Sequence, residues 1–341
     1  MSSVIANELV KHKYIDLCFL SLFEGQEKTF YYLNHNIKRY KLYEQQVSGV
    51  KNFLGYIAKI RRFVKKMNID ILIDIDGILD MYSIPALVGT KVKLVSWEQF
   101  NYFQNPYVGY RKTTRRLAAR FADAIVVLTD EDKGYYEDNL KIKNKIVRIY
   151  NPMEEKHCQN TYSEKRNIIL SAGRLTEQKG FDLLIEVAKI VLEKNENWKW
   201  YILGDGEDKE KLEEKIQKYG LQNKLILKGS VRDIDIYYDQ AAMFVLTSRY
   251  EGFGLVLTEA KQKYLPCISF ECPAGPAEII MNSINGYLVE CFDIQDMAEK
   301  INKLIEEPCL RKEFSNNALM GTEKFNIKEI AEQWINLFFE I

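Results

Sequence analysis

Two glutamates and two glycines frame one short stretch of the chain, SRYEGFGLVLTEA at residues 248–260. A Gly-Phe-Gly turn lets the backbone approach a ligand closely, and free amides at the start of a helix near Leu255 favour an anion such as phosphate. Glu259 could then accept hydrogen bonds from a ribose diol, and Glu251 from the hydroxyls of a sugar. The alternative is a helix with an acidic first turn, which stabilises the helix dipole without any ligand.

Two cations flank a second corner, in ILSAGRLTEQKGFDLLIEVA at residues 169–188. A strand ends before Gly173, which permits a tight turn, and Arg174 and Lys179 then precede a helix that begins at Phe181. Two cations beside a helix N-terminus can bind a diphosphate through charge-assisted hydrogen bonds. The alternative is that both are solvated loop charges.

Two further corners have the same character. Gly204 and Gly206 follow a strand in WYILGDGE, without the third glycine of a dinucleotide fingerprint, and SFECPAGPAEII at residues 269–280 joins a strand to a Gly/Pro turn. The carboxyl ends of parallel strands meet at one edge of a sheet, so we expect these corners to converge there.

Short apolar runs alternate with amphipathic helical patterns along the chain, which is typical of parallel sheets with right-handed crossovers. The sequence therefore predicts an α/β protein with two Rossmann-like, doubly wound domains. The predicted helices include 50–67, 181–193, 209–219 and 295–306. The predicted strands are 15–22, 69–75, 92–96, 124–128, 146–149, 168–171, 198–203, 224–227, 243–246, 267–270 and 286–289.

The polar segment 150–166, which contains Pro152, is the predicted domain boundary. We expect an N-terminal domain at 1–152 and a C-terminal domain at 153–325. A C-terminal helix at 326–341 is expected to pack back on the first domain.

The first residues, SSVIANELVKHK, read as a helix, whereas a doubly wound domain opens with a strand and a turn. We therefore expect the first domain to lack its opening strand, with 15–22 and 69–75 on one side of a gap and 92–96, or its neighbour, facing them. The same reasoning places the start of the gene about 15–20 residues upstream, the length of one strand and a turn.

Composition excludes several classes of function. The 341 residues contain 48 acidic and 48 basic side chains, so no net field favours nucleic acid. Six cysteines without CxxC spacing and only three histidines argue against a zinc site and favour a reducing cytoplasm. No apolar run of about 18 residues and no secretory signal is present in the sequence, so we expect a cytoplasmic protein.

Basic residues gather in two predicted helices, near the aromatic residues Tyr102, Phe103 and Tyr107. Such a surface could lie on the anionic inner face of the cell membrane, and the alternative is a solvated helix face. The basic residues are Arg61, Arg62, Lys65, Lys66, Arg111, Lys112, Arg115, Arg116 and Arg120. A separate triplet, Asp74-Ile75-Asp76, has the DxD pattern of some Mn²⁺ sites. It ends an apolar strand far from the phosphate motifs, so we expect it to line the acceptor side or end the strand, and we expect no metal.

The motifs GRLTEQKG, LGDGE, EGFGLVLTE and CPAGPAEII, in this order and spacing, resemble the C-terminal half of retaining GT-B glycosyltransferases of family 4. VVLTDEDKGYY and YNPM are similar, less specifically, to the segments that lead into that family's linker. The resemblance implies two Rossmann-like domains facing across a cleft. It also implies transfer of a sugar from a nucleotide diphosphate, usually UDP and sometimes GDP or ADP, to an acceptor hydroxyl. By this resemblance, 1–152 is the acceptor-side domain and 153–325 is the nucleotide-sugar-binding domain.

The resemblance assigns roles that agree with the chemistry of the residues. It places Arg174, Lys179 and Glu251 at the reacting centre, with Arg174 and Lys179 on the diphosphate, Glu251 on the transferred sugar and Glu259 on the ribose. The remaining donor-binding residues are Gly173, Gly252, Phe253, Gly254, Leu255 and Val256, with the backbone at Val231 and Arg232 near the base. Cationic stabilisation of the leaving diphosphate would support metal-independent, retaining hexosyl transfer without an enzymic nucleophile or cofactor.

One departure from the family concerns WEQFNY, where similar proteins have histidine at the position of Gln99. Gln99 can donate hydrogen bonds but carries no charge, so its contact with donor or acceptor could pass to Glu98 or Asn101. We therefore predict a glycosyltransferase of bacterial surface polysaccharide synthesis that acts on a glycan or lipid-linked acceptor. A non-hydrolysing sugar-nucleotide epimerase and a catalytically weak sugar-nucleotide-binding protein are the alternatives.

Overall fold

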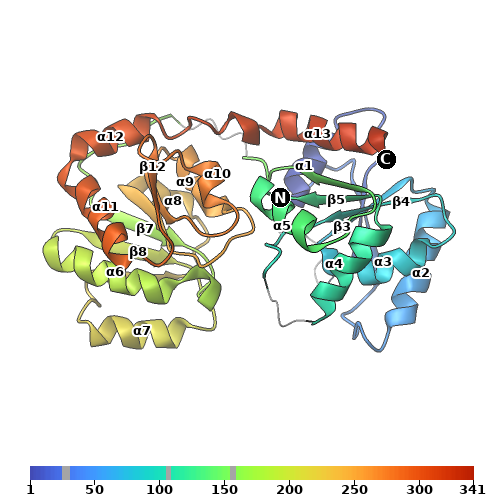
Figure 1. Ribbon diagram of the computed structural model, residues 1–341, viewed down its shortest axis with the longest axis horizontal. Coiled ribbons are helices and arrows are strands. Elements are labelled where there is room, and N and C mark those ends of the chain that lie inside the picture. The colour runs from blue at the N-terminus through green and yellow to red at the C-terminus, as the bar shows by residue number, and fades with distance from the viewer. Residues whose placement is uncertain (25–30, 105–108, 154–158) are drawn as a thin grey trace. The chain divides into compact units, whose positions relative to one another are not determined.

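The computed structural model describes residues 1–24, 31–104, 109–153 and 159–341. The chain divides into two compact units. Unit 1 comprises Met1–Glu154 with Lys324–Ile341, and unit 2 comprises Glu155–Glu323. Each unit is an α/β structure with parallel sheets, as the alternating pattern predicts (Figure 1).

The strands of unit 1 form two separate parallel sheets. One contains β1 (Cys18–Phe23) and β2 (Lys38–Tyr43), and the other has the order β3-β4-β5-β6. The strands of the second sheet are β3 (Ile71–Ile75), β4 (Lys93–Trp97), β5 (Ala124–Val127) and β6 (Lys145–Arg148). Among the described residues, the strands of unit 1 are therefore interrupted between β1 and β3.

Helices pack on both faces of the sheets in unit 1. Amphipathic α2 and its neighbours α3 and α4 pack in a row, and Tyr56, Ile60 and Val64 of α2 enter the core together with Ile125 of β5. Thr129 caps α5, because its hydroxyl accepts a hydrogen bond from the amide of Asp132. The helices are α1 (Ser2–Leu9), α2 (Phe53–Lys66), α3 (Asp80–Leu87), α4 (Gly109–Phe121), α5 (Asp130–Asn139) and α13 (Ile327–Glu340), with the 3₁₀ turns η1 (Gly77–Leu79) and η3 (Glu323–Phe325) at or beside the unit.

The C-terminal helix α13 lies in unit 1, where it packs on α1. Its Trp334 makes an edge-to-face contact with Trp97 of β4, with the ring centroids 5.0 Å apart. The bridge between Met153 and Asn326 joins the returning chain to the end of the first pass through the unit. Apolar contacts therefore hold the two ends of the sequence within one core.

Unit 2 contains one six-stranded parallel sheet with the order β12-β11-β10-β7-β8-β9. Its central strands are apolar and buried on both faces, as expected where helices cover the two sides. The strands are β7 (Ile168–Ala172), β8 (Lys199–Leu203), β9 (Leu225–Gly229), β10 (Met243–Leu246), β11 (Cys267–Phe270) and β12 (Gly286–Val289).

Helices α11, α6 and α7 form a row on one face of this sheet (Figure 1). The apolar stripe of α6, which includes Leu184, Val187 and Val191, packs against Trp200 and Ile301 in the core. The helices are α6 (Phe181–Lys194), α7 (Lys209–Lys218), α8 (Asp235–Gln240), α9 (Leu255–Gln262), α10 (Pro276–Ile279), α11 (Ile294–Glu306) and α12 (Pro308–Asn316), with the 3₁₀ turn η2 (Glu177–Lys179) before α6.

All eleven strands that the sequence predicts are present within three residues of their predicted ends, whereas β2 was not predicted. Its sequence, KRYKLY, mixes charged and apolar residues and lacks a buried apolar run. The predicted position of the gap is also wrong, because β3 hydrogen-bonds to β4. The interruption therefore separates 71–75 from 18–23 and does not leave them on the same side.

Candidate active site

The predicted phosphate and sugar residues lie at the carboxyl ends of neighbouring strands in unit 2. β11, β10 and β7 are adjacent in the sheet, and β8 follows β7. Because these strands are parallel, the loops that leave their carboxyl ends emerge at one edge. The sequence-distant segments 173–180 and 247–254 therefore meet, as the motif spacing predicts.

Hydrogen bonds join these two loops directly. The amide of Arg249 donates to the carbonyl of Gln178 at 2.8 Å, and the side chain of Gln178 donates to the carbonyl of Tyr250 at 3.1 Å. The Arg249 guanidinium holds both carboxylate oxygens of Asp182 at 2.8 Å. Such a bidentate pair fixes both direction and distance, so the loop after β10 is held against the start of α6.

Gly180 permits this close approach. Its φ is 62°, in the left-handed region, and a Cβ there would lie 2.1 Å from the carbonyl oxygen of Thr247. The Thr247 hydroxyl also donates to the carbonyl of Gly180 at 3.0 Å. A side chain at position 180 would push the two loops apart, so the glycine is required by packing as well as by backbone conformation.

The two loops bring Lys179 and Glu251 into an ion pair. The Lys179 Nζ lies 2.7 Å from Glu251 Oε1, and the Ser248 hydroxyl donates to the same oxygen at 2.6 Å. Glu251 is 4% exposed, and its amide donates to the carbonyl of Pro273 in the Gly/Pro corner at 269–280. A carboxylate can accept both bonds without losing the capacity to accept more from a ligand.

Arg174 lies on the exposed side of the same corner. No hydrogen bond or ion pair of its side chain is found among the described residues, in contrast to the paired Lys179. The guanidinium can therefore bind an anion without first breaking a contact, whereas Lys179 would have to share its charge between Glu251 and the anion.

The turn EGFG and the start of α9 have the predicted geometry. Gly254 precedes the helix with a φ of 95°, and no side chain caps the N-terminus. The amides of Leu255 and Val256 in the first turn are thus available as donors. No acidic residue lies in that first turn, so the alternative of a helix stabilised only by an acidic first turn is wrong.

Glu259 lies one turn into α9, half-buried, and its carboxylate accepts a hydrogen bond from the Tyr238 hydroxyl at 3.1 Å. Tyr238 also lies within 3.3 Å of the carbonyl oxygen of Val256. Burial raises the pKa of Tyr238 well above its ordinary value, and the Glu259 charge adds to this effect. The phenol therefore stays protonated and keeps the Glu259 side chain in place.

The LGDGE corner approaches the same edge. The Gly204 amide donates to the carbonyl of Gly229 at 2.9 Å, and a Cβ on Gly204 would lie 1.9 Å from the carbonyl oxygen of Gly173. Val231 and Arg232 follow β9 after one intervening residue, Ser230, with Val231 half-buried and Arg232 exposed. The glycines therefore pack one corner on the next, and the predicted nucleobase segment follows the adjacent strand.

Glu98 and Gln99 belong to unit 1. Glu98 is buried, and its Oε1 lies 3.7 Å from Nε of buried Arg115, which also donates to the carbonyls of Asn101 and Tyr102. Burial raises the pKa of Glu98, and the Arg115 charge opposes that shift. The contacts of Glu98 are thus internal, while Gln99 is half-buried.

The DxD triplet is also occupied by internal contacts. Asp74 is buried and accepts a hydrogen bond from Ser83 at 2.9 Å, and Asp76 forms a two-point ion pair with Arg111 at 3.0 and 3.1 Å. No cluster of potential metal ligands is found among the described residues. These contacts give both aspartates a structural role. Tyr107 of the predicted basic surface lies outside the described residues.

Sequence reasoning missed the residues that support the site. Asp182 and Arg249 hold the loops, Ser248 holds Glu251, and Tyr238 holds Glu259. Ser248 and Arg249 stand in the quoted motif and could have been considered. Tyr238 gives no local signal, because it reaches Glu259 across 21 residues.

Comparison with known proteins agrees with this architecture. The family model described as glycosyl transferases group 1 matches residues 152–319. An uncharacterized glycosyltransferase of Haemophilus influenzae is 30% identical over 332 residues, covering 97% of this chain and 92% of that protein. A Campylobacter jejuni α-1,4-N-acetyl-D-galactosaminyltransferase, whose name specifies an undecaprenol-linked substrate, is 29% identical over 350 residues, covering 99% and 93%.

A solved structure shows the same relationship. The S. aureus TarM mutant in complex with fondaparinux, α-GlcNAc-glycerol and UDP has a TM-score of 0.73 and 27% identity, covering 83% of this chain and 58% of that one. The two α/β units, each with parallel strands, are those of a GT-B glycosyltransferase. Fold, motif order and similarity over nearly the whole chain lead to one conclusion: the chain belongs to the glycosyl transferases group 1 family.

Proposed function

We propose that this protein transfers a hexose from a UDP-sugar to a hydroxyl of a glycan or lipid-linked glycan during synthesis of a bacterial surface polysaccharide. The names of its relatives support this proposal: one acts on an undecaprenol-linked glycan, and another, 36% identical over 218 residues, is an amylovoran biosynthesis glycosyltransferase of Erwinia amylovora. The solved relative bound to UDP supports the choice of nucleotide.

The observation that carries the proposal is the Lys179–Glu251 pair beside the exposed Arg174. A diphosphate between the two cations would receive charge-assisted hydrogen bonds from both, and the α9 amides would add uncharged donors. These contacts strengthen as negative charge grows on the leaving phosphate, so they lower the barrier to cleavage of the glycosidic bond. Fixed cations thereby perform the role that a metal ion has in other nucleotide-sugar enzymes.

The contacts of Glu251 support a role in positioning the sugar. Its Oε1 already accepts from Lys179 and Ser248, which fixes the direction of the carboxylate. We assign it to the hydroxyls of the transferred hexose and assign no covalent intermediate to it. The acceptor oxygen would attack from the face that the diphosphate leaves, and a departing phosphate oxygen would take the acceptor proton, which retains the anomeric configuration.

Family membership favours transfer over epimerisation. A catalytically weak binder is the remaining alternative, because Gln99 provides no charge at its position. Gln99 would serve as a neutral donor to the sugar or phosphate, which a glutamine amide can do at any pH.

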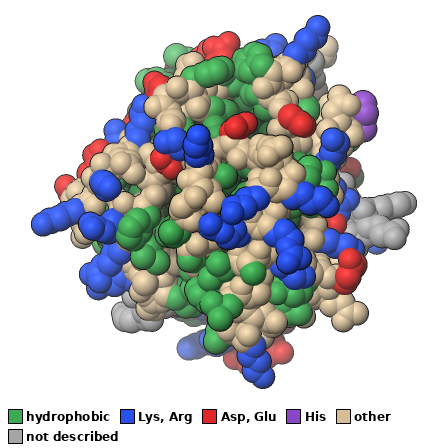
Figure 2. All heavy atoms as spheres, turned by 90° about the vertical axis from the view of Figure 1, so that its right-hand side faces the viewer, with side chains coloured by type: hydrophobic (Ala, Val, Ile, Leu, Met, Phe, Trp, Pro, Cys, Tyr) green, Lys and Arg blue, Asp and Glu red, His purple; other side chains and the backbone are tan. Residues whose placement is uncertain are grey.

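The helices α2 and α4 expose cations that could place the enzyme on an anionic membrane. Arg62, Lys65, Lys66, Arg116 and Arg120 are exposed, whereas Arg61 donates to the carbonyls of Ala86 and Val88 and Arg111 pairs with Asp76. Figure 2 shows blue side chains beside green hydrophobic ones on this side of the molecule. Among the described residues, no helix is long and apolar enough to cross a membrane, so contact through this surface would be peripheral.

The test is turnover of radiolabelled UDP-hexoses with membrane extract as the source of acceptor. Hydrolysis or transfer that persists in EDTA and releases UDP would support the proposal. Tight UDP binding with no release of UDP from any hexose donor would identify a binding protein. Interconversion of the free UDP-sugars would identify an epimerase.

A further inference from the structure

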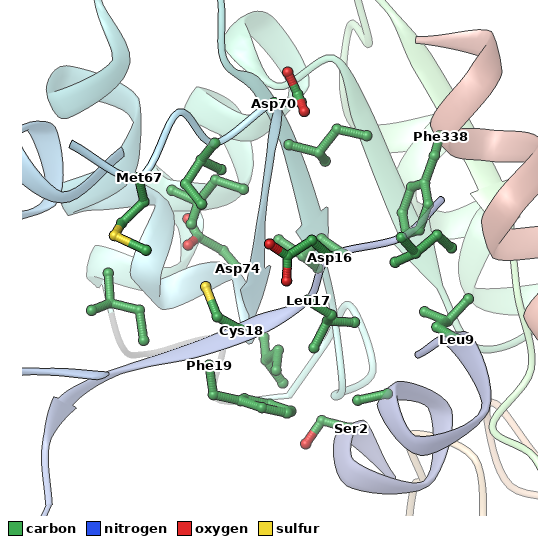
Figure 3. Close-up of a pocket in the computed structure, with 18 of the residues that line it drawn as sticks. Ser2, Leu9, Asp16, Leu17, Cys18, Phe19, Met67, Asp70, Asp74 and Phe338 are labelled. Atoms are coloured by element: carbon green, nitrogen blue, oxygen red, sulfur yellow. The ribbon is translucent and has the colours of Figure 1, made fainter. Parts of the chain in front are cut away.

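Unit 1 contains a cavity of about 670 Å³ at the interruption of its sheet (Figure 3). Its walls include β1 on one side and β3 on the other. Figure 3 shows Leu9 of α1 and Phe338 of α13 on one side of β3, and Met67, at the end of α2, on the opposite side. We refer to this cavity as the strand slot. It is bounded by two strands at its edges and by apolar helix side chains at its faces.

Each of the two strands at the slot has one edge that pairs with no other described strand. In the described part of the chain, β1 pairs only with β2, and β3 pairs only with β4. Successive N–H and C=O groups of a strand point alternately to its two neighbours, so about half of those in β1 and β3 point away from their present partner. Unpaired backbone groups within a protein interior each cost about 1–3 kcal/mol.

β1 and β3 consist mainly of apolar residues, yet most of these residues are only half-buried. Residues CFLSLF of β1 are half-buried except for exposed Phe23, and only Asp74 of ILIDI in β3 is fully buried. In the same unit, AIVV of β5 is buried throughout. Apolar strands flanked by helices on both faces are normally buried at every position. β1 and β3 are less covered than this, and both line the slot.

The strand edges favour one kind of occupant. A lipid chain would fill the volume but would provide no hydrogen-bond partners for the N–H and C=O groups of β1 and β3. A polypeptide strand provides both donors and acceptors along its edges.

We propose that the slot is a binding site for one extended polypeptide segment, apolar on both faces, that pairs with β1 and β3 together. Binding would join the two-stranded and four-stranded sheets of unit 1 into one sheet. The segment needs about six residues to match the six of β1 and the five of β3. This proposal does not depend on the sugar donor or on catalysis.

Cys18 provides a direct reporter, because its thiol is free, half-buried and in the slot wall. The experiment adds a peptide with the core Val-Ile-Val-Ile-Val-Ile and two lysines at each end to the 341-residue chain. Alkylation of Cys18 is followed by mass spectrometry, with exposed Cys309 as the internal control. We expect the peptide to slow alkylation of Cys18 at least tenfold, to slow amide exchange in 71–75, and to leave Cys309 unchanged.

Two controls separate strand pairing from hydrophobic adsorption. The same peptide N-methylated at every second residue keeps its side chains but cannot donate along one edge, and we expect no protection from it. Ala6→Trp, in the slot wall, should abolish the peptide effect, whereas Ala58→Trp on the exposed face of α2 should preserve it.

Three outcomes would overturn the proposal. Equal protection by both peptides, or by a prenyl alcohol, would identify a lipid pocket. Protection that increases with protein concentration, without peptide, would identify a second copy as the occupant. Unchanged Cys18 alkylation and unchanged exchange in β3 at saturating peptide would show that the slot does not accept a strand.

Discussion

Replacement of Lys179 by methionine tests the centre of the site. The Lys179 stem packs on Gly173, where a Cβ would lie 3.3 Å from its Cγ, Cδ and Cε atoms, and methionine retains most of that apolar contact. The substitution removes the charge that lies 2.7 Å from Glu251, leaving a carboxylate whose side chain is only 6% exposed with Ser248 as its donor.

Two free energies follow from this geometry. Loss of a partner from a fully buried pair costs about 3–5 kcal/mol. The 17% exposure of Lys179 and the remaining Ser248 bond reduce this to about 2 kcal/mol here. For a domain of this size, that corresponds to a fall in melting temperature of about 4–8 °C. Loss of one charge-assisted bond to the diphosphate costs about 1.5–3 kcal/mol, or roughly 10- to 150-fold in UDP affinity.

The double variant Lys179→Met/Glu251→Gln separates these effects. Neutral glutamine needs no cation and can still accept from Ser248, so stability should largely return while UDP affinity stays low. Calorimetry of UDP and uridine binding, together with thermal melting, gives both quantities. Lys211→Met, at an 80% exposed lysine, should change neither. UDP affinity equal to wild type in the double variant would refute the assignment of Lys179 to the diphosphate.

Three further predictions address other parts of the molecule. Glu259→Gln should weaken UDP binding several-fold in calorimetry, whereas Glu251→Gln should spare UDP affinity and lower hexose turnover; equal loss of affinity in both would contradict their separate roles. Burial raises the pKa of Asp132 to about 7, compared with about 3.9 in the unfolded chain. The charged carboxylate therefore lowers the free energy of unfolding, with its full effect above about pH 7 and a progressively smaller effect as the pH falls toward about 3.9. The melting temperature of unit 1 should therefore increase as the pH is lowered from about 8 to about 5.5, and Asp132→Asn should flatten this dependence. An unchanged slope in the variant would refute the assignment to Asp132. Arg116→Ser/Arg120→Ser should weaken sedimentation with phosphatidylglycerol vesicles by about 1 kcal/mol per cation and leave binding to phosphatidylcholine unchanged; equal retention on both lipids would argue against an electrostatic surface.

The sequence alone determined the fold class and the order of the motifs. Buried parallel strands such as MFVL and CISF are short apolar runs that stand out between amphipathic helices, so their existence is a local property. The convergence of Arg174, Lys179, Glu251 and Glu259 also followed from sequence, because parallel strands place their carboxyl ends at one edge whatever the details of packing.

Only the tertiary structure decided which partners these residues have. The Lys179–Glu251 pair spans 72 positions, and the Glu259–Tyr238 bond spans 21, so neither appears in any local pattern. Glu98 looked available beside Gln99 until Arg115 was found against it in the core. The gap lies between β1 and β3 because β3 obtains its hydrogen bonds from β4. Strand order depends on which backbone edges satisfy each other across the whole unit, and a strand's own residues do not encode the identity of its neighbour.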